Sequence, residues 1–470
     1  MRQFMFWTTL LSITAVTAQD LNRSDRTLYG GGDSGIYGSP QVCGVQPAIT
    51  GGQNEDSSSD ADVEIEGNDQ WDVTASHGPT EELSFKTDEG TWMSCDVSSD
   101  GKEIVFDLLG DIYTMPMSGG KATPLTSGPA WDIQPTFSPG GEKIAFTSDE
   151  GGGDNIWIME RDGSNRKQVS KEKFRLLNNP VFTADGQYII ARKHFVDTRS
   201  IGAGEMWMYH LSGGEGVQIS ERRDWQHDAG EPHVSPDGQY LYYSQDVSPG
   251  NSFEYNRNPY GTIYAIDRID LDTGEKERVV GGLGGAATPQ LSPNGRILAF
   301  VRRVGLKTVL FVKDLDTGNE RPIFDRLNRD AQETWAIFGI HPGYSWTPDG
   351  ESIIISAKGH FWQVDVDGGT ALEIPFEAEV RQSITGTVKI PVEVGSESFQ
   401  VRATRDARTS PNGKKVVFHA LGRLHLSNSD GSGRRLLTSS EKVREYDPAW
   451  SPNGKKVAFA SWRDGKTGGI

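Results

Sequence analysis

The sequence predicts an all-β protein, a β-propeller of four-stranded antiparallel blades, and three observations carry this prediction. A turn of the form Ser/Thr-Pro-Asp/Asn-Gly recurs, with variations, eight times, beginning at Ser98, Ser138, Thr183, Ser235, Ser292, Thr347, Ser410 and Ser451. The copies are 40 to 63 residues apart, and a period of about 40 to 50 residues is typical of propeller blades. Apolar residues flank each turn with a period of two, as in half-buried strands. We therefore expect about eight repeats, the last of them incomplete.

One repeat can be divided into its four strands. Residues 134–138 are the expected inner strand, and residues 142–148, 155–161 and 166–170 are the second, third and outer strands. The turn between the first two has residues suited to it, since Pro fixes φ, Asp or Asn tolerates the next position and Gly accepts a positive φ. A helical solenoid would need apolar spacings of three and four, which are missing.

The N-terminal residues differ from the repeats and predict three regions. Residues 1–18 resemble a signal peptide, with Arg2 ahead of an apolar run and small residues before Gln19; an uncleaved anchor is the alternative. Residues 19–70 are rich in Gly, Ser, Asp and Glu, which predicts a flexible acidic linker. The propeller is expected over residues 71–470. We expect an exported protein, periplasmic or extracellular, without a transmembrane segment after signal removal.

Composition excludes several classes of protein. The net charge of −18 argues against a nucleic-acid partner, which requires a basic surface. Cys43 and Cys95 are too few for a disulfide framework or a zinc site, and two unpaired thiols are expected, with a Cys43–Cys95 disulfide as the alternative.

The spacing of the repeats grows in the middle of the chain because connections lengthen, notably residues 193–204, 221–230, 246–261 and 321–341. Long loops on a rigid ring often carry binding residues. The candidates are Arg199, Glu205, Arg222, Asp224, Trp225, His227, Tyr255, Asn256, Tyr260 and Trp335. They form either a ligand site or packing contacts, over the mouth of the ring or on a neighbouring domain.

A second set of candidates precedes the turns, where a Pro recurs three residues before the turn motif. The residue before each such Pro is expected to be extended and to face the central channel of the propeller. These positions, with equivalents by spacing, are Ser94, Gln134, Asn179, Glu231, Thr288, Gly343, Asp406 and Asp447. They predict a small, polar and mildly acidic ring; capping of the turns is the alternative role.

The repeated phrase resembles the WD-repeat-like blades of TolB-type propellers over residues 71–470. Segments 90–94, 106–113, 200–207 and 332–336 further resemble the propeller region of secreted bacterial proteins that fuse it to a C-terminal amidohydrolase domain. That domain would need a His-x-His strand motif, further His, a metal-bridging Lys and a catalytic Asp. None of these is present, so no catalytic residue, metal ligand or cofactor is expected in this chain. Zinc or another divalent metal would belong to the further domain.

Two functions therefore remain open. The first is an exported propeller that binds a protein, a peptide or a substrate without catalysis of its own. The second is the non-catalytic propeller half of a metal-dependent amidohydrolase whose catalytic domain lies beyond residue 470, in which case the partner is that domain. The sequence ends soon after the eighth turn, and either the chain is a fragment or a strand near residues 83–85 completes the last sheet.

Overall fold

The computed structural model describes residues 72–173, 175–196, 202–250, 254, 257–386, 392, 395, 397–440, 442–464, 466 and 468–470. The expected signal peptide and linker, residues 1–70, lie outside this part. Every regular element of the described residues is a strand, and none is a helix long and apolar enough to span a membrane. Seven four-stranded antiparallel sheets confirm the all-β propeller class.

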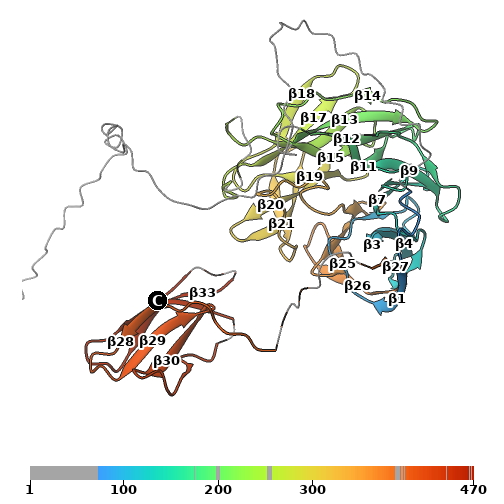
Figure 1. Ribbon diagram of the computed structural model, residues 1–470. Coiled ribbons are helices and arrows are strands. Elements are labelled where there is room, and N and C mark those ends of the chain that lie inside the picture. Colours follow the sequence, from blue (N-terminus) through green and yellow to red (C-terminus); the bar gives the residue numbers. More distant parts are fainter. Residues whose placement is uncertain are drawn as a thin grey trace, which may run out of the picture. The chain divides into compact units, whose positions relative to one another are not determined.

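Six of these sheets are consecutive blades, each with its strands in sequence order (Figure 1). The first three are β2 (Cys95–Val97), β3 (Glu103–Leu108), β4 (Asp111–Pro116) and β6 (Thr123–Pro124); β7 (Asp132–Phe137), β8 (Lys143–Ser148), β9 (Asn155–Glu160) and β10 (Lys167–Gln168); and β11 (Leu176–Phe182), β12 (Tyr188–Val196), β13 (Gly202–His210) and β14 (Val217–Gln218).

The next three blades follow the same order. They are β15 (Ala229–Val234), β16 (Tyr240–Asp246), β17 (Tyr264–Asp270) and β18 (Lys276–Val280); β19 (Ala287–Leu291), β20 (Ile297–Val304), β21 (Lys307–Asp314) and β22 (Glu320–Phe324); and β23 (Ser345–Trp346), β24 (Ser352–Ala357), β25 (His360–Asp365) and β26 (Ala371–Ile374).

The inner strands of these six blades form a closed ring. Each contacts the inner strand of the next blade, and β2 of the first contacts β23 of the sixth. The turns of neighbouring blades also contact one another around the ring. Pro139 of the second turn lies 3.7 Å from the ideal Cβ position of Gly186 in the third turn. Pro348 of the sixth turn lies 3.6 Å from the ideal Cβ position of Gly101 in the first turn. These glycines have positive φ values of 67°. The propeller therefore closes with six blades.

A further strand covers the seam between the first and sixth blades. β27 (Phe376–Thr385) pairs antiparallel with β1 (Thr80–Thr87) and parallel with β5 (Gly120–Lys121). Phe376, Ala378 and Val380 of β27 are buried in one cluster with residues of both blades. The N-terminal strand at residues 83–85 thus pairs with β27 and does not complete the last sheet, because its partner is the strand that follows blade six.

The remaining repeats form two sheets, described by themselves. One contains β28 (Arg405–Thr409), β29 (Lys415–Ala420), β30 (Arg423–Asn428) and β31 (Arg435–Leu436); the other contains β32 (Arg444–Trp450) and β33 (Val457–Trp462). β28 and β32 lie against each other, and Pro411 of the seventh turn lies 3.5 Å from the Cβ position of Gly454 in the eighth. The two sheets therefore repeat the blade-to-blade packing of the ring.

Candidate functional site

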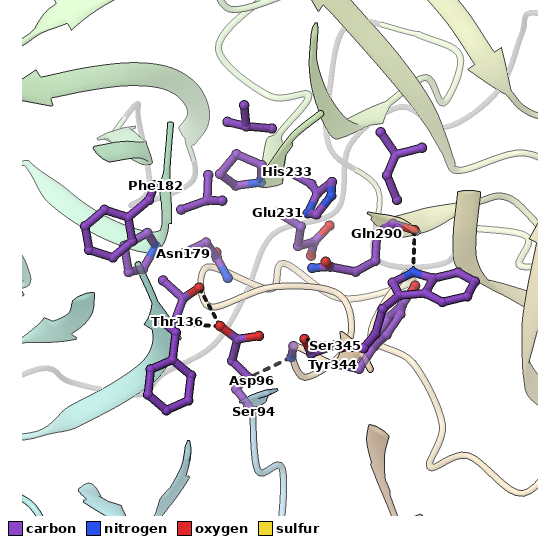
Figure 2. A pocket seen from close by; sticks show the side chains of 18 of the residues that line it. Ser94, Asp96, Thr136, Asn179, Phe182, Glu231, His233, Gln290, Tyr344 and Ser345 are labelled. Atoms are coloured by element: carbon purple, nitrogen blue, oxygen red, sulfur yellow. Dashed lines mark hydrogen bonds between the residues drawn. The ribbon is translucent and has the colours of Figure 1, made fainter. Parts of the chain in front are cut away.

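A pocket of about 460 Å³ lies on the axis of the six-bladed ring and is lined by its inner strands (Figure 2). Because side chains alternate in direction along a strand, each blade contributes residues two apart. The first layer consists of Ser94, Gln134, Asn179, Glu231, Thr288 and Gly343; the second consists of Asp96, Thr136, Val181, His233, Gln290 and Ser345. The structure thus places six of the positions named from their spacing on the pocket wall.

The backbone at the first layer differs from the expectation. Gln134, Asn179, Glu231 and Thr288 have φ values between 51° and 57°, so the prediction that the following Pro holds them extended is wrong. Each sits at a break in the ladder between the inner strand and its neighbour. The extra residue of a β-bulge removes its N–H from the ladder and bends the strand.

Side chains of the preceding blade accept several of these freed N–H groups. Asp107 of the first blade accepts the backbone N–H of Gln134 at 2.7 Å, and the side-chain oxygen of Gln134 accepts that of Asn179 at 2.8 Å. Ser244 of the fourth blade accepts the N–H of Thr288 at 2.8 Å. The bulges therefore link blade to blade, which accounts for the polar residues buried at this layer.

The connection between blades five and six, residues 325–343, runs across one end of the channel; we call it the cross-channel segment. Its carbonyl groups accept hydrogen bonds from Gln134 (2.7 Å to Phe338 O) and Arg192 (3.0 Å to Ile337 O). The N–H of Ile340 donates to Oε1 of Glu231. Since these partners belong to the second, third and fourth blades, the segment closes the pocket at that end.

A buried ion pair fixes the start of the cross-channel segment. Arg303 of β20 lies 2.6 Å from Asp330, and both side chains are at most 2% exposed. Thr308 donates to the second oxygen of Asp330 at 2.6 Å, and Glu333 contacts Arg303 at 2.8 Å. The pair is fully hydrogen-bonded, which offsets the desolvation of its charges.

The pocket lining contains carboxyl groups and no side chain of Lys or Arg. The carboxyl groups belong to Asp96 and Glu231. Burial raises the pKa of both carboxyl groups, against the hydrogen bonds that each accepts. Burial lowers the pKa of His233 and His341 to about 4, so both imidazoles are neutral.

Three polar side chains of the lining are unengaged within the described part of the chain. No hydrogen bond involves the amide groups of Asn179 and Gln290 or the ring of His233, and Figure 2 shows Asn179 and Gln290 directed into the open space. Asp96, by contrast, accepts the N–H of Phe137 at 2.7 Å and the hydroxyl of Thr136 at 3.0 Å. The unengaged groups can each donate and accept hydrogen bonds.

The loop candidates gather elsewhere and mostly contact one another. Arg222 pairs with Glu205 at 3.0 Å, and its guanidinium lies 4.1 Å from the ring centroids of both Phe195 and Trp225. His227 and Asp224 lie 2.6 Å apart. These contacts join the loop side chains to one another, although Nη1 of Arg222 and Nε2 of His227 have no hydrogen-bond partner among the described residues. The residues expected in a loop at 193–204 largely extend the β12–β13 hairpin.

The other loop candidates are dispersed. Trp335 belongs to the cross-channel segment, with its ring centroid 5.3 Å from that of His194, and Tyr260 is 51% exposed. None of the described loop candidates lines the axial pocket. Arg199, Tyr255 and Asn256 lie outside the described residues.

Asp406 and Asp447 are not among the residues that line the pocket, which corrects their assignment to the same ring of residues. Both occupy the matching bulge of their strands, with φ values of 55° and 49°. Their strands, β28 and β32, come after the six blades that enclose the pocket. Their equivalence by sequence is therefore correct, but blade six already completes the ring.

The second layer, including Asp96, His233 and Gln290, was not named from the sequence. The period of two would have found it, since each of its members stands two residues after a first-layer position. In the described part of the chain, no cluster of three His, Cys, Asp or Glu side chains could hold a metal. Cys95 is a buried free thiol, and Cys43 lies outside the described residues.

A closed ring of four-stranded sheets around an axial pocket defines a β-propeller. More specifically, residues 80–256, which include the first three blades of the ring, match the family described as the TolB beta propeller domain, PD40, so this part of the chain is TolB-like.

Among curated proteins, the chain is 27% identical over 232 residues to the uncharacterized peptidase YuxL of Bacillus subtilis, covering 49% of this chain and 29% of that protein. It is 26% identical over 187 residues to the Tol-Pal system protein TolB of Helicobacter hepaticus, covering 39% of this chain and 44% of TolB. The chain thus spans less than half the length of these two relatives. The crystal structure of TolB from Acinetobacter baumannii shares 16% identity at a TM-score of 0.45, covering 61% of this chain and 65% of that one.

Proposed function

We propose that this protein is a binding propeller that holds a segment of a partner polypeptide in its axial pocket and performs no catalysis of its own. The observation that carries the proposal is the set of unengaged side chains, Asn179, His233 and Gln290, that line a pocket of about 460 Å³. Each presents both a donor and an acceptor. A peptide group offers one of each, so an extended polypeptide is a matched ligand.

The size and composition of the pocket are consistent with this ligand. Its volume falls within the range of about 300 to 1,000 Å³ typical of ligand pockets. The apolar rings of Pro135, Pro180 and Pro232, which follow the first-layer residues Gln134, Asn179 and Glu231, also line the pocket. The partner we propose is a protein or peptide rather than a nucleic acid, because the pocket is acidic and the chain carries a net charge of −18.

A second candidate is a propeller that positions substrate for a hydrolase domain outside this chain. The match to part of the peptidase YuxL favours it, as does the resemblance of segments 90–94 and 106–113 to propeller–amidohydrolase fusions. Any zinc or other divalent metal would then be held by that domain. For both candidates we propose export to the periplasm or the extracellular space, through residues 1–18.

A displayed library of random linear heptapeptides, followed by calorimetric titration of the selected peptides, tests the proposal. The blocking variant is Gln290→Trp, which fills the pocket from its wall. The matched control is Leu372→Trp, on the outer strand β26, where the side chain is 64% exposed. We expect peptides to bind the wild-type protein and the control with equal affinity and Gln290→Trp at least about tenfold more weakly. Failure to select any peptide, or equal binding by Gln290→Trp, would contradict the proposal.

A further inference from the structure

We propose that the axial pocket recognises a primary ammonium group of its polypeptide ligand, at the chain's N-terminus or on a lysine side chain. This inference rests on the proposed function and adds the chemistry that the pocket selects. Three independent features of the site support it: the sign of its charges, the kind of hydrogen-bonding groups it presents, and its closed end.

The charges of the lining attract a cation. Asp96 and Glu231 are its two charged residues, and no Lys or Arg lines the pocket. The guanidinium of Arg192, which also contacts the cross-channel segment, is held by Asp228 at 2.6 Å and by backbone carbonyls of Ala229 and Ile337. Its charge is therefore matched locally. A cleft lined by one sign of charge raises the local concentration of the opposite sign.

Three buried polar atoms, two in the first layer and one on the neighbouring His341, have no hydrogen-bond partner within the described part of the chain and can each accept a hydrogen bond. Oε2 of Glu231, Oγ1 of Thr288 and Nε2 of His341 have no hydrogen-bond partner among the described residues. These side chains are 7%, 3% and 2% exposed. Nδ1 of His341 lies 3.0 Å from the carbonyl of Pro342. Because a carbonyl only accepts, Nδ1 carries the proton and Nε2 is an acceptor.

An ammonium group is the complement of such a layer. It has three N–H donors and no acceptor, whereas a hydroxyl or an amide brings acceptors that would face the carboxylates. A buried acceptor without a partner costs about 1 to 3 kcal/mol, so a donor that reaches this layer is stabilised. The amides of Asn179 and Gln290, which Figure 2 shows directed into the open space of the pocket, supply further oxygen acceptors.

The cross-channel segment determines how a ligand enters. It hydrogen-bonds to Gln134, Arg192 and Glu231 across the ring, so a polypeptide cannot pass through the axis. A polypeptide ligand can therefore reach the first layer only with a chain terminus or with the tip of a long side chain. The α-ammonium group of a chain's N-terminus and the ε-ammonium group of a lysine side chain both satisfy this condition.

Four probes with an uncharged C-terminus distinguish an α-ammonium group from an ε-ammonium group as the ligand. Each is titrated calorimetrically into the full chain. Alanyl-alanine amide carries an α-ammonium group, and its N-acetylated form does not. N-acetyl-alanyl-lysine methylamide carries only the ε-ammonium group, and the same compound acetylated on the lysine carries none. We expect at least one ammonium-bearing probe to bind at least about tenfold more tightly than its acetylated form.

Two isosteric variants test the role of the carboxylate. Glu231→Gln keeps an oxygen that can accept from Ile340 and removes the charge, and we expect it to abolish the preference for the ammonium-bearing probe. Glu205→Gln is the matched control, since Glu205 is 4% exposed but does not line the pocket, and we expect it to keep the preference.

The outcomes distinguish this inference from the proposed function. If acetylated and free probes bind equally and both lose affinity in Gln290→Trp, the ammonium subsite is excluded while the peptide pocket stands. If Glu231→Gln retains the preference, the carboxylate is not its source and the inference is overturned. If probes bind Gln290→Trp as they bind the wild type, the pocket is not the site and both proposals are contradicted.

Discussion

Phe106 of the first blade and Phe361 of the sixth meet with their ring centroids 5.0 Å apart and an interplanar angle of 64°. Phe376 of β27 lies 5.5 Å from each of them, measured between ring centroids. The three rings connect the first blade, the sixth blade and the strand β27, which covers the seam between these two blades. They belong to the buried apolar cluster at the seam where the ring closes.

Replacing Phe376 by Ala should open this seam. We expect Phe376→Ala to lower the free energy of unfolding by about 3 to 5 kcal/mol, the usual cost of removing a buried aromatic ring. Urea unfolding monitored by circular dichroism measures it. Leu372→Ala, at a position 64% exposed, should change the value by less than about 0.5 kcal/mol. A loss below about 1 kcal/mol at Phe376, the size of a surface effect, would show that other contacts hold the seam.

The Arg303–Asp330 pair should be far more important than the exposed pair Arg296–Asp316. Arg303→Leu leaves the carboxylate of Asp330, 0% exposed, without its cation, which costs about 3 to 5 kcal/mol. Arg296→Leu removes a pair whose side chains are 65% and 63% exposed, and such pairs contribute about 1 kcal/mol at most. Equal denaturation midpoints for the two variants would refute the anchoring role of Arg303.

The bulge conformation predicts opposite effects at two equivalent positions. Thr288 is β-branched with φ of 56°, and Asn179 has φ of 53°; Asn tolerates this region and Thr does not. We expect Thr288→Asn to raise the unfolding free energy, and Asn179→Thr to lower it, each by about 1 kcal/mol. Thermal unfolding of both variants in parallel is the test, and changes of the same sign would contradict the backbone argument.

His341 should make the protein less stable in mild acid. Burial holds its folded-state pKa at about 4, below the ordinary value of 6.5, so the folded state binds fewer protons than the unfolded state. This contribution to stability is complete above about pH 6.5 and is lost as the pH falls towards 4. Between pH 7 and pH 5 the loss attributable to His341 is about 2 kcal/mol. Denaturant unfolding at both pH values should show a smaller drop for His341→Gln, and an identical drop would disprove the assignment.

The contacts around Arg222 predict a structural role for Trp225. Arg222 is held between the rings of Trp225 and Phe195, each 4.1 Å away. Trp225→Ala should therefore lower the unfolding free energy by about 1 kcal/mol. Tyr260→Ala, at a side chain 51% exposed, serves as the comparison and should be nearly neutral. If both variants have the unfolding midpoint of the wild-type protein, Trp225 has no structural role, and a ligand-binding role for this loop is favoured instead.

The candidate site was only partly predictable from the sequence. The Pro-containing motif located Gln134, Asn179, Glu231 and Thr288 because the bulge and the turn recur at a fixed separation along the chain. His233 and Gln290 follow from the same strands by alternation. The sequence does not predict that His341 and the cross-channel segment close one end of the pocket. A connection without periodicity gives no indication of which blades it will contact.

The sequence by itself determined the blade: its four strands, its turn and the face that each strand buries. These depend on local sterics and on the alternation of apolar residues, which are written within each repeat. Only the tertiary structure decided how many blades close. Gln134 and Asp447 occupy the same place in their repeats, yet only Gln134 lines the pocket. At the closure, Phe106, Phe361 and Phe376 are buried against one another, and residues so distant in sequence are brought together only by the fold.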